Sequence, residues 1–133
     1  MTVQYIDSVK YSRMEAVRAK IDTGSGTACI KVYTTPRPAT GGTPTGATLL
    51  ATINLGNPSG TTTAGDLALS VAAETIIAAS GAPNWARVLD RDGAVVGDMS
   101  VGLPGSGADL EVGSSYLYAG GKLLPTSAYL RDG

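Results

Sequence analysis

Hydrophobic and polar residues alternate most clearly between Asn84 and Gly102, on both sides of the dipeptide Asp92-Gly93. Asp-Gly is typical of a tight β-hairpin turn, because glycine adopts positive φ angles without strain. If the turn contains these two residues alone, Arg87 pairs with Asp98 across the hairpin. One face of the hairpin then carries the apolar side chains of Ala86, Val88, Val95, Met99 and Val101. A three-residue loop over residues 91–93 would mix charged and apolar residues on the same faces, so the pattern favours the two-residue turn.

Other segments show the same alternation and predict further short strands. They are residues 28–33, 49–55, 67–71, 75–79, 109–112, 115–119 and 122–130. Pro125 cannot donate a ladder hydrogen bond, so the last of these strands lies at an edge or carries a bulge. About nine short strands at close spacing are typical of an antiparallel β-sandwich or jelly roll. The expected fold class is therefore mainly β, with one short N-terminal helix.

The helix is predicted from a change of period at Ser12. Ser12 and Glu15 have the spacing of a capping box, and Gly24 stands where a helix would end. Apolar residues recur at helical spacing at Met14, Val17 and Ile21. We expect a helix over residues 12–21, an extended N-terminal arm over residues 1–11, and a single β-sandwich domain over residues 12–133 that includes this leading helix.

Residues 34–48 predict a long surface loop, because prolines and glycines within them prevent regular structure. Loops of this length are often functional, and this one carries no reactive cluster, so we expect a contact loop on an assembly surface. Trp85 beside Arg87 is a second candidate for contact with a partner, since both residue types are favoured at binding hot spots. The alternative for Trp85 is a half-buried position at a strand end.

Composition and charge narrow the possible functions. The chain has 133 residues and a net charge of −1, which fits one domain and offers no basic patch for nucleic acid. Cys29 is the only cysteine and the chain has no histidine, so we expect no metal, no haem and no other cofactor. The N-terminus lacks the apolar core of a signal peptide, and no apolar run is long enough for a membrane span. We therefore expect synthesis and folding in a reducing cytoplasm, without membrane contact.

The segment Asp22-Thr23-Gly24-Ser25 matches the catalytic signature of aspartic proteases. A small homodimeric enzyme of this class would place one Asp22 from each subunit side by side, and Val95-Val96-Gly97 could supply its apolar-apolar-Gly element. However, Arg18-Ala19-Lys20 precedes the motif where the family has an apolar strand. A polar helix end followed by a glycine turn explains the same residues, and we favour it.

The segment Asp90-Arg91-Asp92-Gly93 has the first residues of a calcium loop but not its later ligands, because Glu111 lies too far along the chain. The hairpin turn accounts for it.

Three segments together resemble a family of small proteins encoded in the structural-gene modules of tailed bacteriophages and prophages. The likeness lies in residues 13–38 (RMEAVRAKIDTGSGTACIKVYTTPRP), residues 49–53 and residues 85–102, and from residue 13 to residue 102 it spans most of the chain. It implies a structural rather than catalytic role for Asp22, and a virion component that is not an enzyme. The specific role implied is a capsid decoration or cement protein of β-sandwich type on the outside of the major capsid lattice.

The expected partner is the major capsid protein, with homo-oligomers on the virion surface after synthesis in the bacterial host cytoplasm. The residues expected at interfaces are Thr2, Val3, Tyr5, Ile6, Pro36, Arg37, Pro38 and Trp85. A tail or head-tail structural protein is the first alternative, and a homodimeric aspartic protease using Asp22 is the second.

Overall fold

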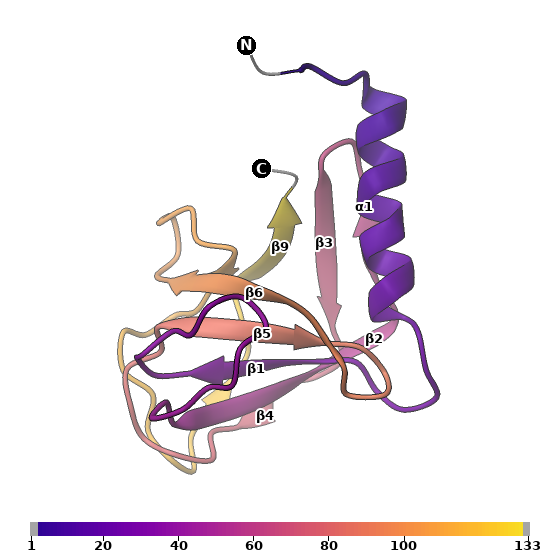
Figure 1. Cartoon of the computed structure of the whole chain (residues 1–133). Coiled ribbons are helices and arrows are strands. Elements are labelled where there is room, and N and C mark those ends of the chain that lie inside the picture. Colours follow the sequence, from indigo (N-terminus) through magenta and orange to yellow (C-terminus); the bar gives the residue numbers. More distant parts are fainter. Residues whose placement is uncertain (1–2, 132–133) are drawn as a thin grey trace.

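A computed structural model describes residues 3–131 and shows one long helix standing beside a curved sheet (Figure 1). The helix is α1 (Asp7–Ile21). The strands are β1 (Cys29–Tyr33), β2 (Leu49–Thr62), β3 (Asp66–Val71), β4 (Thr75–Ile76), β5 (Trp85–Leu89), β6 (Val95–Gly102), β7 (Leu110–Glu111), β8 (Lys122–Leu123) and β9 (Ser127–Arg131). The mainly β class with one N-terminal helix is confirmed.

The main sheet closes into a barrel in the order β1-β2-β3-β9-β7-β6-β5, with β5 returning to β1. Its neighbours are antiparallel except for the parallel pair β6 and β7. Strands β4 and β8 form a separate two-stranded sheet. The strands of the main sheet thus form a closed barrel, where the sequence predicts the finer class of a β-sandwich or jelly roll.

Strand β2 makes the closure possible. It is 14 residues long and continues to Thr62, well beyond the predicted strand over residues 49–55. Its first half pairs with β1, and its second half pairs with β3 after a register shift between Leu55 and Gly60. Such an irregularity bends a strand and increases its twist, so one strand serves two walls of the barrel.

The barrel interior is filled by aliphatic side chains, and α1 adds to them. The fully buried members include Ile21, Ile30, Val32, Leu50, Ile53, Leu67, Val88, Met99 and Leu110. Every residue of β5 is buried, although only Ala86 and Val88 belong to the interior cluster. The outer face of β5 is therefore covered as well, and the 34–48 loop described below contacts this face at Trp85.

The hairpin of β5 and β6 pairs Arg87 with Asp98, as predicted. The predicted turn is wrong: Asp90 N donates to Ala94 O at 2.9 Å and Gly93 N donates to Asp90 O at 3.1 Å, so the loop consists of residues 91–93. A register shift between Val88 and Leu89 leaves one extra residue on β6 and restores the predicted pairing beyond it. The shift also turns Val95 outward, where it is 39% exposed, which corrects its assignment to the core.

The helix begins at Asp7, so the predicted arm over residues 1–11 is too long. Ser12 does not cap the helix, because its hydroxyl donates to Ser8 O within the helix at 3.0 Å. The N-cap position is Ile6, in an extended conformation and without a side-chain cap, and the acidic Asp7 in the first turn suits the positive end of the helix dipole. The arm is confined to the residues before Asp7, of which 3–6 are described.

The C-terminal third forms less regular structure than predicted. Among described residues, the segment 115–119 makes only one isolated bridge, between Leu117 and Gly81. The predicted strand over residues 122–130 is divided at Pro125 into β8 and β9. The predicted strand over residues 75–79 is reduced to β4.

Candidate interaction surfaces

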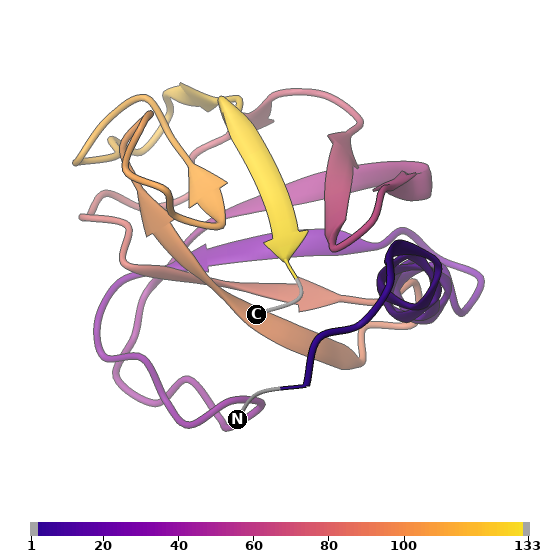
Figure 2. The same ribbon diagram turned by 90° about the horizontal axis from the view of Figure 1, so that it is seen from above.

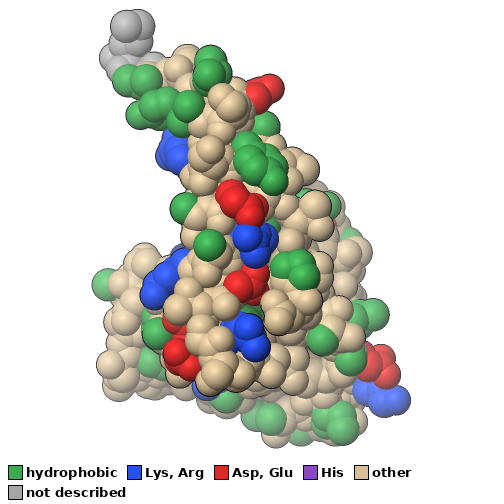
Figure 3. Space-filling view, turned by 90° about the vertical axis from the view of Figure 1, so that its right-hand side faces the viewer, with side chains coloured by type: hydrophobic (Ala, Val, Ile, Leu, Met, Phe, Trp, Pro, Cys, Tyr) green, Lys and Arg blue, Asp and Glu red, His purple; other side chains and the backbone are tan. Residues whose placement is uncertain are grey.

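The arm and the first turns of α1 form an apolar projection that extends beyond the barrel. Its exposed large side chains are Val3, Tyr5, Ile6, Val9 and Tyr11. Val3 and Ile6 are 67% and 70% exposed, and helix residues are buried only from Met14 onward. Figure 3 shows hydrophobic side chains gathered at the free end of the helix. Val3, Tyr5 and Ile6 are thus accessible to a partner, whereas Thr2 lies outside the described residues.

A polar network fixes the other end of α1 to the barrel. Arg18 donates to Asp22 Oδ2 at 2.7 Å and to Glu15, and Glu15 accepts from the Thr62 hydroxyl of β2 at 2.7 Å. Asp22 Oδ1 accepts from Ser59 N of β2 at 3.0 Å. The hydrogen bonds from Arg18 and then Thr62 hold the pKa of Glu15 below its ordinary value. Figure 3 shows acidic and basic side chains alternating along this part of the molecule.

The protease-like loop lies directly on the hairpin turn. Gly26 N donates to Arg91 O at 3.0 Å, Arg91 N donates to Thr23 O at 3.0 Å, and Ser25 N donates to Asp92 Oδ1 at 3.2 Å. A Cβ at Gly26 would lie 2.4 Å from Arg91 O, so only glycine permits this approach. The protease-like and calcium-like motifs therefore pack against each other and have a structural role.

In the calcium-like segment, backbone N–H groups of the turn donate hydrogen bonds to the first carboxylate, that of Asp90. Asp90 Oδ1 accepts from Asp92 N and Ala94 N, both at 2.9 Å. The backbone bond from Ala94 is the main cause that lowers the pKa of Asp90 below its ordinary value. These are the bonds of a side chain that closes a turn.

We expect the substitution Asp22→Asn to lower the free energy of unfolding by about 1 kcal/mol and Asp22→Ala by about 2 kcal/mol. Asparagine keeps an oxygen for Ser59 N but loses the charge that attracts Arg18, whereas alanine removes both contacts. Urea unfolding of the three proteins measures this order. A peptidase activity with an acidic optimum, present in the wild type and abolished by Asp22→Asn, would contradict the structural role of Asp22.

The 34–48 loop is irregular, as predicted, but it is fastened to the barrel. Thr34 N donates to Thr48 O at 3.1 Å, and Thr48 N donates to the Thr34 hydroxyl at 2.9 Å, which closes the base of the loop. Near the middle of the loop, Gly41 N donates to Asp98 Oδ2 on β6 at 3.1 Å. The candidate contact residues Pro36 and Arg37 are exposed in this loop, and Pro38 is half-buried.

Trp85 is fully buried, which corrects its prediction as a surface anchor. Its ring stacks on Tyr33 with centroids 4.6 Å apart, and its Nε1 donates to Thr34 O at 2.9 Å. Trp85 therefore holds the base of the loop rather than a partner. The sequence places Trp85 on the outer face of its strand but contains no signal that a distant loop covers that face.

Beside Trp85, the predicted pair of Arg87 and Asp98 is buried. Arg87 Nε donates to Asp98 Oδ1 at 2.7 Å, and the two side chains are 6% and 0% exposed. Burial acts to raise the pKa of Asp98, but the bonds from Arg87 and Gly41 together outweigh it and leave the pKa below its ordinary value. The hydrogen bond with Asp98 raises the pKa of Arg87.

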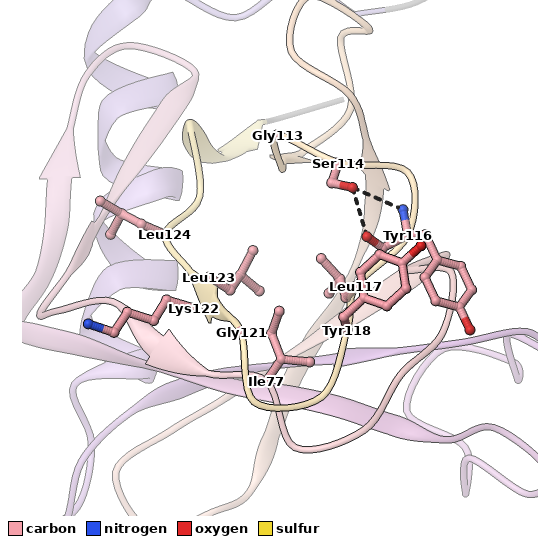
Figure 4. A pocket seen from close by; sticks show the side chains of 10 residues that line it. All are labelled: Ile77, Gly113, Ser114, Tyr116, Leu117, Tyr118, Gly121, Lys122, Leu123 and Leu124. Atoms are coloured by element: carbon pink, nitrogen blue, oxygen red, sulfur yellow. Dashed lines mark hydrogen bonds between the residues drawn. The ribbon is translucent and has the colours of Figure 1, made fainter.

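A shallow cleft of about 330 Å³ lies near β4 and β8, and the sequence reasoning did not identify it. Figure 4 shows the side chains of Ile77, Leu117 and Leu123 around the hollow, with Tyr116 and Tyr118 side by side at its edge. The two rings are 4.8 Å apart, and Tyr118 is 68% exposed. The alternation Tyr-Leu-Tyr could have indicated this arrangement, because it places two tyrosines opposite a buried leucine.

The cysteine, the possible metal ligands and the helix give no sign of a reactive or membrane-spanning site among the described residues. Burial raises the pKa of the Cys29 thiol more than Lys31 lowers it, which opposes nucleophilic behaviour. Within residues 3–131, no group of three or more His, Cys, Asp or Glu side chains is placed to hold a metal ion. The helix in this part of the chain is not long and apolar enough to cross a membrane.

The geometry therefore offers three exposed surfaces for protein contact: the apolar projection, the outer part of the 34–48 loop, and the tyrosine cleft. Comparisons with protein-family models, with curated proteins and with solved structures found no match to this chain.

Proposed function

We propose that the protein is a structural component of a tailed-bacteriophage virion, and specifically a capsid decoration protein that binds neighbouring subunits of the major capsid protein. The resemblance in residues 13–38, 49–53 and 85–102 supports the virion role. The structural observation that carries a binding role is the apolar projection, in which Val3 and Ile6 stand in solvent ahead of a helix that is firmly attached at its other end.

The projection and the 34–48 loop supply contacts without changing the barrel. Exposed apolar residues gathered on a projecting segment are costly in a free monomer and mark an interaction site. A specific contact needs only about 800 Å² per partner, and a lattice that repeats the site lets several modest contacts act together. A protein of this kind strengthens the lattice by linking subunits and needs no reactive group.

Removal of residues 1–6 is expected to weaken attachment to capsids at least about tenfold while the barrel remains folded, because the arm lies outside the core. Particle composition and the heat resistance of particles measure the effect. The substitution Ile6→Asp tests the same surface in the full chain. Ile76→Asp is its control, since Ile76 is 66% exposed and lies in β4, outside the arm.

The location of the protein distinguishes this proposal from its alternative. Presence in purified heads supports decoration of the capsid. Presence in isolated tails but not in heads would replace it with a tail or head-tail structural role. Absence from virions altogether would contradict both roles.

A further inference from the structure

The barrel is incompletely paired between β6 and β9. Strand β6 is paired with β5 from Val95 to Ser100, but on its other edge its only strand partner within residues 3–131 is β7, at Val101 and Gly102. Strand β7 is two residues long and connects β6 to the start of β9. The rest of β6 is therefore paired with β5 on one edge, and on its other edge it pairs with no strand of the described residues.

The main-chain groups on this edge point away from β5. Ser100 N donates to the Asp109 carboxylate at 3.1 Å, and Gly102 O accepts from Val112 N at 2.9 Å. Because the direction of main-chain groups repeats every second residue in a strand, N–H and C=O of Asp98 point to the same side. This edge can therefore form hydrogen bonds with an added strand.

A groove of about 340 Å³ follows the unpaired edge. Met14 and Val17 of α1, Val96 and Gly97 of β6, and Leu130 of β9 line it, with arginines at its rim. The groove thus combines an apolar lining with a free strand edge. These are the two features that bind an extended apolar segment by strand addition.

Gly97 leaves space in the groove because it has no side chain. It lies on the same face of β6 as Met99, which is fully buried in the core two residues later. A Cβ added at Gly97 would meet no heavy atom within 4 Å. The space next to Gly97 is therefore empty, although the strand pattern would place a core side chain there.

We propose that this groove binds the arm of a second copy of the chain, with residues 3–6 added as a strand to the free edge of β6. The arm enters α1 through Ile6 in an extended conformation, with φ −71° and ψ 161°. Its length matches the free edge, because four extended residues span about 13 Å, as do the four residues of β6 from Val95 to Asp98. Val3 and Tyr5 lie on one side of such a strand and face the apolar lining.

Charge at the end of the arm is complementary to the rim. Asp7 follows the arm directly, and Arg131 at the rim is 47% exposed, with its Nε 3.9 Å from Asp66. A docked arm brings the Asp7 carboxylate toward this side of the groove.

The arm of the same chain does not occupy the groove. The Tyr5 ring lies 5.0 Å from the Arg13 guanidinium beside the first turns of α1, and Val3 and Ile6 remain exposed. Figure 1 shows the arm leaving the far end of the helix, beyond the strands. Exchange of arms between two copies related by a two-fold axis fills both grooves and closes the assembly as a dimer. This association goes beyond the proposed function and does not depend on it, because the arm and the groove belong to the same chain.

The test is self-association of the purified full chain and its variants, measured by sedimentation up to about 100 µM, which covers the micromolar range of small interfaces. We expect the wild type to dimerise, and we expect Gly97→Val, which fills the groove, to weaken dimerisation at least about tenfold. Gly113→Val is the matched control, since a Cβ at Gly113 also meets nothing within 4 Å but lies in the tyrosine cleft. Deletion of residues 1–6 is expected to abolish dimerisation.

A mixing experiment separates the two halves of the contact. The Gly97→Val chain keeps its arm and the deleted chain keeps its groove, so the mixture is expected to form heterodimers although neither chain dimerises alone. A monomeric wild type, a Gly97→Val protein that dimerises normally, or a mixture without heterodimers would overturn the proposal. If Gly97→Val does not fold, binding of a labelled peptide of residues 1–7 to the deleted chain decides the question. None of these measurements involves capsids, so their failure is distinguishable from failure of the virion role.

Discussion

Replacing Asp98 with alanine is expected to lower the free energy of unfolding by about 3–5 kcal/mol, because it leaves the buried Arg87 guanidinium without its counter-charge. The Arg87 guanidinium carbon lies 5.1 Å from the centroid of the Trp85 ring, and the 34–48 loop bonds to Asp98 through Gly41 N. Water cannot replace the lost carboxylate without opening this cover. Denaturant unfolding measures the effect.

The control for this substitution is Glu74→Ala. Glu74 pairs with Lys122 at 3.3 Å, but the two side chains are 50% and 68% exposed, so its loss is expected to cost less than about 1 kcal/mol. Equal effects of Asp98→Ala and Glu74→Ala would contradict the importance of burial for the first pair.

The buried pair of Arg87 and Asp98 also predicts how the stability of the protein depends on pH. Because folding lowers the pKa of Asp98, its contribution is fully present above the unfolded pKa of about 3.9 and is lost as the pH falls through the lower folded value. Wild-type stability is therefore expected to fall more steeply below about pH 4 than that of Asp98→Asn. Parallel curves for the two proteins in that range would contradict the assignment.

Replacing Trp85 with alanine is expected to destabilise the protein by about 3–5 kcal/mol, the usual loss for a large aromatic side chain removed from a buried site. The substitution removes the stack on Tyr33 and the hydrogen bond to Thr34 O, so the base of the 34–48 loop loses its main anchor. Unfolding experiments measure the loss of stability, and hydrogen exchange in residues 34–48 shows whether the loop opens.

The exposed Tyr118 supplies the control for Trp85. Tyr118→Ala removes an aromatic ring that is 68% exposed and is expected to change stability by less than about 0.5 kcal/mol. A Trp85→Ala protein that unfolds like the wild type but loses binding to a partner would return Trp85 to its predicted role as a surface anchor.

Several features of the protein follow from local patterns in the sequence. Alternation correctly predicts β5 and β6 and the pairing of Arg87 with Asp98, because side chains of a strand alternate between its two faces. The apolar period at Met14, Val17 and Ile21 correctly predicts the buried stripe of α1. The exposure of Val3, Tyr5, Ile6, Pro36 and Arg37 agrees with their choice as contact residues. Whether they bind a capsid stays a prediction.

Two other interpretations from local patterns were wrong. The Asp-Gly signal and the separation of faces both favoured a two-residue turn, but the chain forms a three-residue loop and restores the register with an irregularity in β6. The capping-box pattern at Ser12 and Glu15 was equally misleading, because both side chains have other partners and the helix continues back to Asp7.

Only the tertiary structure decided how distant segments meet. Ser25 and Asp92 are 67 residues apart and join the two motif loops, and Gly41 and Asp98 are 57 residues apart and join the 34–48 loop to the barrel. Closure of the barrel likewise depends on the register irregularity between Leu55 and Gly60, which lets β2 continue beyond the predicted strand and pair with β3. The sequence by itself determined the places of strands such as β1, β5 and β6 and the faces of β5 that are apolar, because these depend on neighbours along the chain. Which polar face is covered, and which strand edge stays open, depends on the path of the whole backbone.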